Sequence, residues 1–544
     1  MADIIFRRGF SIGQPAAEED SQYLYACFID NGVFELATDV EERKCILVGR
    51  TGSGKSAIIE KIVSEKSNTI RLNPEYLSLN NISNSSIINF FEEAGIHLDS
   101  FYKTIWKHIF IIVLIKKKYN ILEEKDFSRA LSSLSSLYKR DATKDAAIQY
   151  IQQWNNSFWI DEEYRLQQLT NKVETDFSAN VDVNLLSKAK MGVKGARNLT
   201  EEEKTDIVHH GQSVIVDRNQ IKQLENVIKL LAENVFYDKN NPYYICIDSL
   251  DDDWAEDKIR FKLIKALFET IRSFKTMTNV KIIITMRVDL IDSLFSSINS
   301  GGFQSEKYKG YFINMKWTKT DLQELINKRV NYLFEYKYTK WNVNASDIIA
   351  KSVGKKQSGI EYIIDRTFFR PREVIAFFNG CLEVAEGKSF ISDTDIKKAE
   401  YNYSNERVIA LCEEWSRLYP YLTNFLDVVR GINDGVEVSH LLSGKFQEFC
   451  AEYSDFSKKN NYDYSIEAEN AYLDMKKSGL VFIRLILGIL YKVGVIGLKL
   501  HSNTKRVFLF SEDLKIDQRH IELTSKVYVH KAFWVALGIQ GGDT

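Results

Sequence analysis

The chain has 544 residues, which is too long for one hydrophobic core and suggests roughly three or four domains. Its composition is that of a globular protein, with 44% hydrophobic and 27% charged residues, and its net charge of -2 argues against nonspecific capture of nucleic acid by the whole molecule. The six cysteines are scattered without a CxxC pair, which argues against a disulfide framework or a structural zinc site and favours a reducing, cytoplasmic setting.

The sequence predicts no membrane span. The run Ile105–Ile115 is about half the length that a bilayer requires and contains Lys107. The run Leu480–Leu498 carries Arg484 and Lys492. The N-terminus lacks the apolar stretch of a secretory signal. We therefore interpret both runs as buried core and expect no membrane partner.

Three apolar runs have the character of buried strands. Cys45–Val48 leads into a glycine-rich turn, Tyr243–Ile247 ends at Asp248, and Val280–Thr285 is followed closely by Arg287. Helical patterns with a 3.6-residue period follow the first two runs, at Ile58, Ile59, Ile62 and Val63, and at Leu263, Ile264, Leu267, Phe268 and Ile271. Strands that alternate with helices predict an α/β fold, with a parallel sheet that binds ligands at its carboxyl edge.

A long segment between the first two strands has a helical composition. No proline occurs from Glu75 to Asn241 and no glycine from Ile96 to Met191. We therefore expect the first domain, residues 1–300, to carry a large helical insertion at about 116–240. Residues 301–412 read as a helical lid.

The C-terminal part, residues 413–544, predicts a winged-helix-like domain. Short helices precede two strand-like runs, Ile496–Leu500 and Arg506–Phe510, which a polar turn would join into a hairpin. The region from Leu418 onward holds 15 basic and 15 acidic residues, so that it has no net charge to attract DNA. DNA binding by the hairpin residues Lys499, Lys505 and Arg506 is one interpretation, and a packing or protein-contact module is the other.

The strongest motif is a phosphate-binding loop between the first strand and its helix. Its glycines allow a tight turn whose N–H groups can cradle phosphate oxygens, and the helix N-terminus adds a favourable dipole. Lys55 would pair with the β- and γ-phosphates of ATP, and the Ser56 hydroxyl would bind Mg²⁺. The loop comprises Gly49, Arg50, Thr51, Gly52, Ser53, Gly54, Lys55 and Ser56.

An acidic turn follows the second strand. Asp248 lies at the end of a buried strand and downstream of the loop, where an aspartate can hold Mg²⁺ through water, although it could instead cap the next helix. Asp251 and Asp252 are the nearest carboxylates that could position the attacking water, and the alternative is a solvated acidic turn. Ser249 follows Asp248 and cannot accept a proton at neutral pH.

Three arginines are candidates for nucleotide sensing. Arg287 closes the third strand and could pair with the γ-phosphate, or else form a surface ion pair. Arg370 and Arg372 flank Pro371 at the start of a lid helix, where one of them could reach the nucleotide on closure.

Together these motifs resemble bacterial AAA+-related P-loop ATPases of the KAP and STAND kind. The likeness rests on the loop and on Ile247–Asp251, Thr285–Arg287 and Arg370–Arg372, and it extends to four further segments. These are Phe28–Gly32, Trp106, Lys307–Tyr311 with Trp317, and His530–Gly538. They resemble a group of P-loop ATPases found on mobile elements and in defence loci. The resemblance implies that Lys55, Ser56 and Asp248 bind phosphate and Mg²⁺ and that Arg287 and Arg372 sense nucleotide.

The sequence departs from this pattern in two places. Ser249 stands where many such ATPases carry a second acid, and no arginine lies between Val288 and Asn327. We therefore expect slow ATP hydrolysis in a nucleotide-dependent switch that acts through a protein partner or as a homo-oligomer. The resemblance implies a role in anti-phage defence or in mobile-element biology. An ATP-dependent DNA motor or loader, and a nucleotide-binding scaffold without turnover, are the alternatives.

Overall fold

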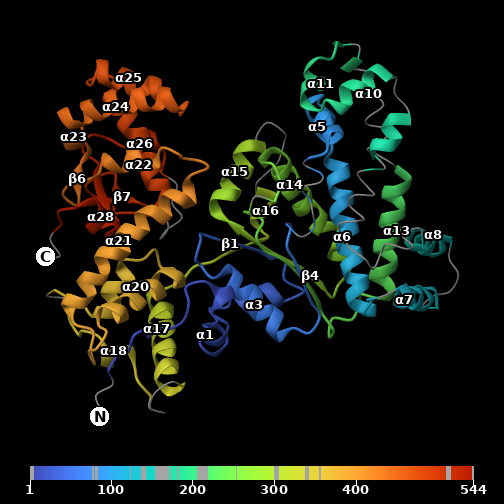
Figure 1. Ribbon diagram of the computed structural model, residues 1–544, viewed down its shortest axis with the longest axis horizontal. Helices are drawn as coiled ribbons and strands as arrows, with labels where there is room; N and C mark the ends of the chain where they lie inside the picture. Colours follow the sequence, from blue (N-terminus) through green and yellow to red (C-terminus); the bar gives the residue numbers. More distant parts are fainter. Residues whose placement is uncertain are drawn as a thin grey trace. The chain divides into compact units, whose positions relative to one another are not determined.

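The computed structural model describes residues 5–541 except 76, 78, 80, 81, 83, 123, 137–141, 153–170, 172, 180–182, 202, 205–217, 253, 299–305, 337–341, 355–356 and 510–515 (Figure 1). The chain divides into two compact units. We call Gly32–Arg50 with Lys55–Met315 the sheet unit. The helical unit consists of Met1–Asn31, Thr51–Gly54 and Lys316–Thr544.

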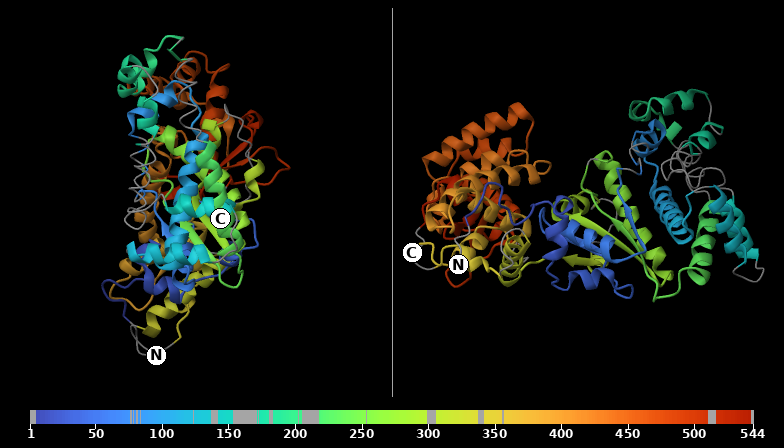
Figure 2. Two further views of the ribbon diagram at one scale, coloured as in Figure 1. Left: turned by 90° about the vertical axis from the view of Figure 1, so that its right-hand side faces the viewer. Right: turned by 60° about the horizontal axis from the view of Figure 1, so that its bottom comes forward.

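The sheet unit contains a five-stranded sheet in the order β2-β3-β4-β1-β5, and every neighbouring pair of strands is parallel. The predicted α/β class and its parallel sheet are therefore confirmed. The three predicted strands are β1, β3 and β4, which are buried almost throughout, as expected for a parallel sheet with both faces covered (Figure 2). The strands are β1 Ile46–Gly49, β2 Thr69–Leu72, β3 Tyr243–Ile247, β4 Val280–Arg287 and β5 Phe312–Asn314.

The two strands at the edges of this sheet were not predicted. In β2 only Leu72 is buried, and β5 has three residues of which only Ile313 is buried. Neither strand therefore produces the continuous apolar run by which a central strand is recognised. Their pairing with β3 and β1 determines their structure more than their own composition does.

The strand order determines which side chains meet at the carboxyl edge. Strand β4 lies between β1, which leads into the phosphate-binding loop, and β3, which leads into the acidic turn. Gly49 is paired with Arg287, and Ile247 with Ile284. Thr285 is therefore next to the position of Asp248. Five helices belong to this part of the unit: α2 Val33–Thr38, α3 Lys55–Glu65, α14 Asp257–Ser273, α15 Val288–Ile298 and α16 Glu306–Lys309.

The described part of the segment between β2 and β3 is mainly helical, as predicted. Helices α6 and α13 lie side by side although about a hundred residues separate them (Figure 1). Trp106 of α6 is buried and donates its indole N–H to Leu263 O of α14 at 2.9 Å. Among the described residues, no helix is long and apolar enough to cross a membrane. The helices are α5 Ser86–Glu93, α6 Asp99–Tyr119, α7 Glu124–Ser136, α8 Ala142–Gln152, α10 Val183–Lys190, α11 Val193–Arg197 and α13 Arg218–Asn234.

The helical unit builds its first core from both ends of the chain. Phe6, Phe10 and Ile12 from the N-terminal segment pack with the helices between residues 319 and 403. Asp20 and Arg329 form a buried ion pair at 2.6 Å, which fastens this segment to α17. The elements are η1 Ala17–Glu19, α1 Ser21–Ala26, α17 Lys319–Phe334, α18 Ala345–Ile348, α19 Gly359–Asp365, α20 Pro371–Val384 and α21 Asp393–Trp415.

A second core in the same unit surrounds a three-stranded antiparallel sheet in the order β6-β8-β7. The predicted hairpin is confirmed at one position, where Leu498 and Val507 form an antiparallel bridge with two hydrogen bonds, while Phe510 of the expected second strand lies outside the described residues. The four-residue ladder of β7 with β8, which lies further along the chain, was not predicted. The elements are α22 Leu422–Asp427, β6 Val436–Glu437, α23 Val438–Leu441, α24 Gly444–Asn460, α25 Ser465–Leu473, α26 Gly479–Val493, β7 Ile496–Lys499, η4 Gln518–His520, β8 Lys526–Val529, η5 Lys531–Phe533 and α28 Trp534–Leu537.

Candidate functional site

The phosphate-binding loop connects β1 to α3. Gly52 and Gly54 have φ angles of +77° and +95°, in the region that glycine adopts without steric cost, so the loop can turn tightly before α3 begins at Lys55. The Lys55 ammonium donates to Gly49 O at 3.0 Å and to Arg50 O at 3.2 Å. The lysine therefore folds back over the start of the loop, close to where a bound phosphate would sit.

Asp248 follows β3 and is 9% exposed. Its Oδ1 accepts a hydrogen bond from the Ser249 N–H at 3.0 Å and another from the Thr285 hydroxyl of β4. Both bonds orient the carboxylate, because each fixes the direction of the same oxygen. Ser249 itself has a φ of +61°, which is uncommon for a residue with a side chain and marks the start of a tight turn.

The remaining acidic residues of the turn lie in different surroundings. Asp251 forms an ion pair with Arg287 at 3.5 Å. Arg287 also donates two hydrogen bonds to the Asp289 carboxylate, at 2.9 and 2.7 Å. Partial burial, together with the negative charge of Asp251, raises the pKa of Asp252. A carboxyl group with a raised pKa is a better proton acceptor than an ordinary aspartate.

Residues from distant parts of the helical unit form hydrogen bonds with the carbonyl oxygens of the segment Thr51–Gly54. Three successive carbonyl oxygens accept hydrogen bonds: Thr51 O from the Arg370 guanidinium at 3.0 Å, Gly52 O from the Arg372 N–H at 3.4 Å, and Ser53 O from the Trp317 indole at 2.8 Å. A Cβ on Gly52 would lie 2.7 Å from the Arg372 side chain, so only glycine fits there. Arg370 and Arg372 thus contact the loop itself.

Glu414, in the last turn of α21, contacts the same segment. One carboxylate oxygen lies 3.4 Å from the Thr51 N–H and the other lies 3.4 Å from the Arg370 guanidinium. Glu373 also lies 3.4 Å from Arg370. Burial opposes the charge of this arginine, but the two carboxylates outweigh burial and raise the pKa of Arg370. It stays a cation.

Several buried polar atoms in and beside this segment have no hydrogen-bond partner among the described residues. They are Thr51 Oγ1 and Ser53 Oγ of the segment, and Nε and Nη2 of Arg370 beside it. Unpaired buried polar atoms cost free energy, so that a phosphate ligand that accepts from the two hydroxyl groups would stabilise them.

A magnesium ion fits the oxygen groups near the loop. Ser56 offers a hydroxyl in the first turn of α3, and Asp248 offers an oriented carboxylate. Mg²⁺ is usually held by one or two such groups together with substrate phosphates. In the part of the chain that the structure describes, no three His, Cys, Asp or Glu residues cluster so as to hold a metal ion.

Four contributing residues were not identified from the sequence as members of the site. Thr285 was noted only as part of a motif and Trp317 only as part of a resemblance. Arg260 and Glu414 were not noted at all, since a lone charged residue within a helical pattern reads as a solvated face. Arg260 is nevertheless 0% exposed and donates to Asp252 O at 2.8 Å.

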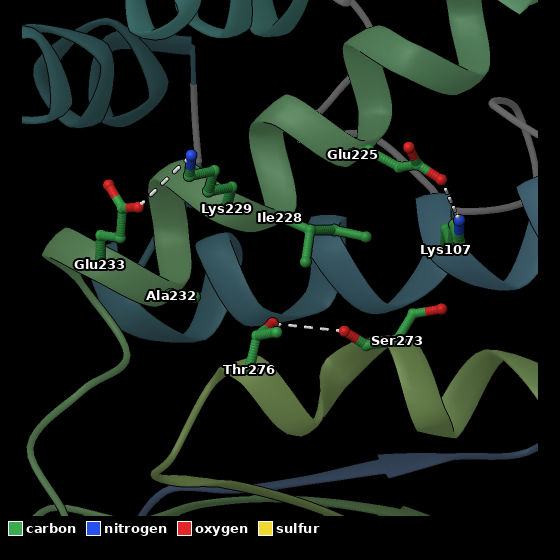
Figure 3. A pocket seen from close by; sticks show the side chains of 8 residues that line it. All are labelled: Lys107, Glu225, Ile228, Lys229, Ala232, Glu233, Ser273 and Thr276. Carbon is green, nitrogen blue, oxygen red and sulfur yellow. Dashed lines mark hydrogen bonds and ion pairs between the residues drawn. The ribbon is translucent and has the colours of Figure 1, made fainter.

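A separate hollow of about 540 Å³ is lined by residues of α6 and α13 and by Ser273 and Thr276 at and just after the end of α14 (Figure 3). Its charged groups pair among themselves, Lys107 with Glu225 at 3.5 Å and Lys229 with Glu233 at 3.9 Å. It contains neither a glycine-rich loop nor an acidic turn, and we assign no function to it. Its remaining lining residues are Ile228, Ala232, Ser273 and Thr276.

Comparisons with known proteins add a limited amount. Residues 320–412 match a family model described as the FunZ-associated C-terminal helical domain. Among solved structures, the chain is similar to a Walker-type ATPase of Pyrococcus abyssi, with 12% identity, coverage of 96% of this chain and 97% of the other, and a TM-score of 0.35. No curated protein matches the chain.

Proposed function

We propose that the chain binds ATP with Mg²⁺ and hydrolyses it slowly, as a nucleotide-dependent switch. The observation that carries the proposal is that two features follow strands of one parallel sheet: the loop that begins at Gly49 follows β1, and the oriented carboxylate of Asp248 follows β3. Lys55 and the loop N–H groups would bind the phosphates. Ser56 and Asp248 would hold Mg²⁺, which neutralises developing charge on the phosphates.

Hydrolysis requires a base or a water-positioning group near the γ-phosphate. Asp252 has the raised pKa that suits a base, and Asp251 lies beside it on the same turn. Arg287 is the cation next to these carboxylates and could pair with the γ-phosphate once it exchanges Asp289 for the ligand.

The switch proposal is supported by the contacts of the segment Thr51–Gly54. Its carbonyls are held by Trp317, Arg370 and Arg372, and the Thr51 N–H lies against Glu414. Helix α21 passes from one hydrophobic core to the other: Tyr403 packs in the first, and Trp415, next to Glu414, packs in the second. We propose that residues 301–412 act as a lid, and that phosphate binding and the position of α21 influence each other through these bonds.

The test is amide hydrogen exchange with and without ATP and Mg²⁺. Nucleotide should change exchange at Arg370–Arg372 and in the last turn of α21 in the wild type and leave both unchanged in Lys55→Ala. If calorimetry shows that ATP binds while exchange in these segments stays the same, the proposed coupling to the lid fails. If the bound ATP is also not hydrolysed, the chain is a nucleotide-binding scaffold.

A second candidate is DNA binding by the C-terminal region, proposed as winged-helix-like. Lys499 and Lys526 lie directly opposite each other in the β7–β8 ladder, where like charges are destabilising unless an anion lies nearby. Lys505 and Arg506 are exposed in the segment that follows β7. A Lys499/Lys505/Arg506 triple alanine variant should weaken binding of duplex DNA and reduce its salt dependence. Wild-type protein that binds no duplex at low salt would leave a protein-contact role.

A further inference from the structure

Arg260 is a fully buried arginine next to the acidic turn. It lies in the first turns of α14 and is 0% exposed, which is rare for arginine unless it is paired. Its Nη1 donates to the backbone carbonyl of Asp252 at 2.8 Å, and its Nη2 donates to Asp257 Oδ1 at 2.5 Å. The guanidinium group therefore joins the start of α14 to the end of the turn.

The geometry of the guanidinium group suits this position. Its donors form a rigid planar fork, so that fixing one arm on Asp257 also directs the other arm. Asp257 lies three residues before Arg260 on the same helix and is half-exposed. The helix thus carries both the arginine and the carboxylate that orients it.

The turn that Arg260 contacts has a backbone that needs support. Ser249 has a φ of +61°, a conformation that costs about 1 kcal/mol or more for a residue with a side chain. Other contacts hold the same turn: the Trp254 indole donates to Leu250 O at 3.1 Å, and the Asp252 N–H donates to Ser249 O at 3.2 Å. Arg287 pairs with the Asp251 side chain at 3.5 Å, whereas Arg260 is the charged group that donates to the backbone of the turn.

We propose that Arg260 is a positioning residue for ATP hydrolysis. By fixing the backbone of Asp252, it holds the carboxyl groups of Asp251 and Asp252 at one place relative to Asp248, so that the attacking water meets a base in a fixed position. Arg260 itself touches neither nucleotide nor metal in this role. The inference rests on the proposed ATPase function and deepens it, because it assigns the positioning of the base to a residue in the first turn of α14.

The experiment compares Arg260→Gln with the matched control Arg272→Gln, in which an exposed arginine of the same helix is replaced. Positioning of a general base contributes roughly 10²- to 10⁴-fold to the rate. Arg260→Gln should therefore lower kcat at least tenfold and change KM for ATP by less than about threefold, since the phosphate-binding loop is untouched. Exchange of the amides at 249–252 should become at least tenfold faster, with β3 and β4 unchanged. The control variant should match the wild type in all three measurements.

A milder variant guards against misfolding of Arg260→Gln. Asp257→Asn leaves the arginine in place but removes the charge that orients its fork, and position 257 is exposed enough to accept the change. It should lower kcat several-fold in the same direction, again without a comparable change in KM. Unchanged kcat in Asp257→Asn and in folded Arg260→Gln would overturn the proposal, and so would unchanged exchange at 249–252.

The failure of this inference can be distinguished from the failure of the proposed function. A wild-type chain that binds and hydrolyses ATP, while both variants do so equally well, refutes only the role of Arg260. A wild-type chain that does not hydrolyse ATP refutes the hydrolytic function and the catalytic part of the inference together. In that case, the exchange measurement still decides whether Arg260 holds the turn.

Discussion

The phosphate-binding loop and the acidic turn are held in opposite ways. The acidic turn is fixed by residues at most 37 positions away in the sequence: Thr285 on the adjacent strand, Trp254 four residues from the carbonyl it binds, and Arg260 at the start of the next helix. The segment Thr51–Gly54 is fixed by Trp317, Arg370 and Glu414, which lie more than 260 residues away in the sequence.

This difference indicates where regulation would act. A group held by its own sheet and helix has the same position whenever the domain is folded. A loop held by distant segments has a conformation that depends on how those segments are packed, and anything that moves them changes the loop. We therefore expect the acidic turn to determine the rate of the hydrolytic step. We expect regulation to act through the conformation of the phosphate-binding loop.

The largest effect on turnover is expected from Asp248→Asn in the acidic turn. The amide keeps the shape of the side chain but removes the charge that would hold Mg²⁺, which supplies several kcal/mol of transition-state stabilisation. Turnover should fall by about 10³-fold while the chain remains folded. Asp251→Asn should behave differently: hydrolysis should slow but remain measurable, and bound, unhydrolysed ATP should accumulate, which rapid filtration with labelled nucleotide can detect. Equal turnover by Asp248→Asn and wild type would remove the metal role.

Arg370→Ala tests the contacts that distant residues make with the phosphate-binding loop. Loss of this buried guanidinium leaves Glu373 and Glu414 without their shared cation, and removal of one partner of a buried charge pair costs about 3–5 kcal/mol. Denaturant unfolding should show this loss, together with weaker ATP binding. Arg372→Ala is the control, because its hydrogen bond to Gly52 O is donated by the backbone and survives the substitution, and it should lose much less stability. Similar losses in the two variants would contradict the assignment.

A finer test of the same contacts is Trp317→Phe. Phenylalanine keeps an aromatic ring but cannot donate to Ser53 O, so one hydrogen bond worth about 1 kcal/mol is lost. ATP affinity measured by titration calorimetry should fall several-fold, with no change in the pH dependence of turnover. An unchanged affinity would indicate that the outer side of the loop does not influence its phosphate side.

The smallest expected effect is on the pH dependence of turnover, through Asp252 of the acidic turn. The pKa of Asp252 is raised, so turnover that depends on its ionised form should decline on the acid side at a higher pH than for an ordinary aspartate. Asp251→Asn removes a negative neighbour and should move the residual acid limb to lower pH. Between the ordinary and the raised pKa, the folded chain holds more protons than the unfolded chain, so this group's contribution to the free energy of unfolding falls as pH rises. If Asp251→Asn leaves the acid side of the pH–rate profile unchanged, Asp252 is not the base.

The sequence predicted those parts of the fold and site whose signal is local. Strands β1, β3 and β4 are buried on both faces and therefore appear as apolar runs, and the loop has its motif within eight residues. Val63 was expected on the apolar side of α3 but is 40% exposed, because the buried stripe of that helix is limited to Ile58, Ile59 and Ile62.

The remaining parts depend on pairing between distant segments. Strand β7 was expected to pair with the run after the polar turn, but β8 offers four residues in register with it, whereas Val507 offers a single bridge. Glu414 has no motif around it and becomes part of the site only because α21 ends next to Thr51 within the helical unit. Arg260 likewise reads as a surface charge until the buried carbonyl that it binds is known.

The central claim, that the loop Gly49–Ser56 binds ATP with Mg²⁺, is tested most directly by calorimetric titration of ATP into the wild-type chain and into Lys55→Ala. Removal of one preorganised cation from a phosphate site should weaken binding by roughly 10²- to 10³-fold, while circular dichroism remains unchanged. We expect saturable, Mg²⁺-dependent binding at one site per chain in the wild type and little or none in the variant. Equal binding by the two proteins, or no binding by a folded wild type, would contradict the account.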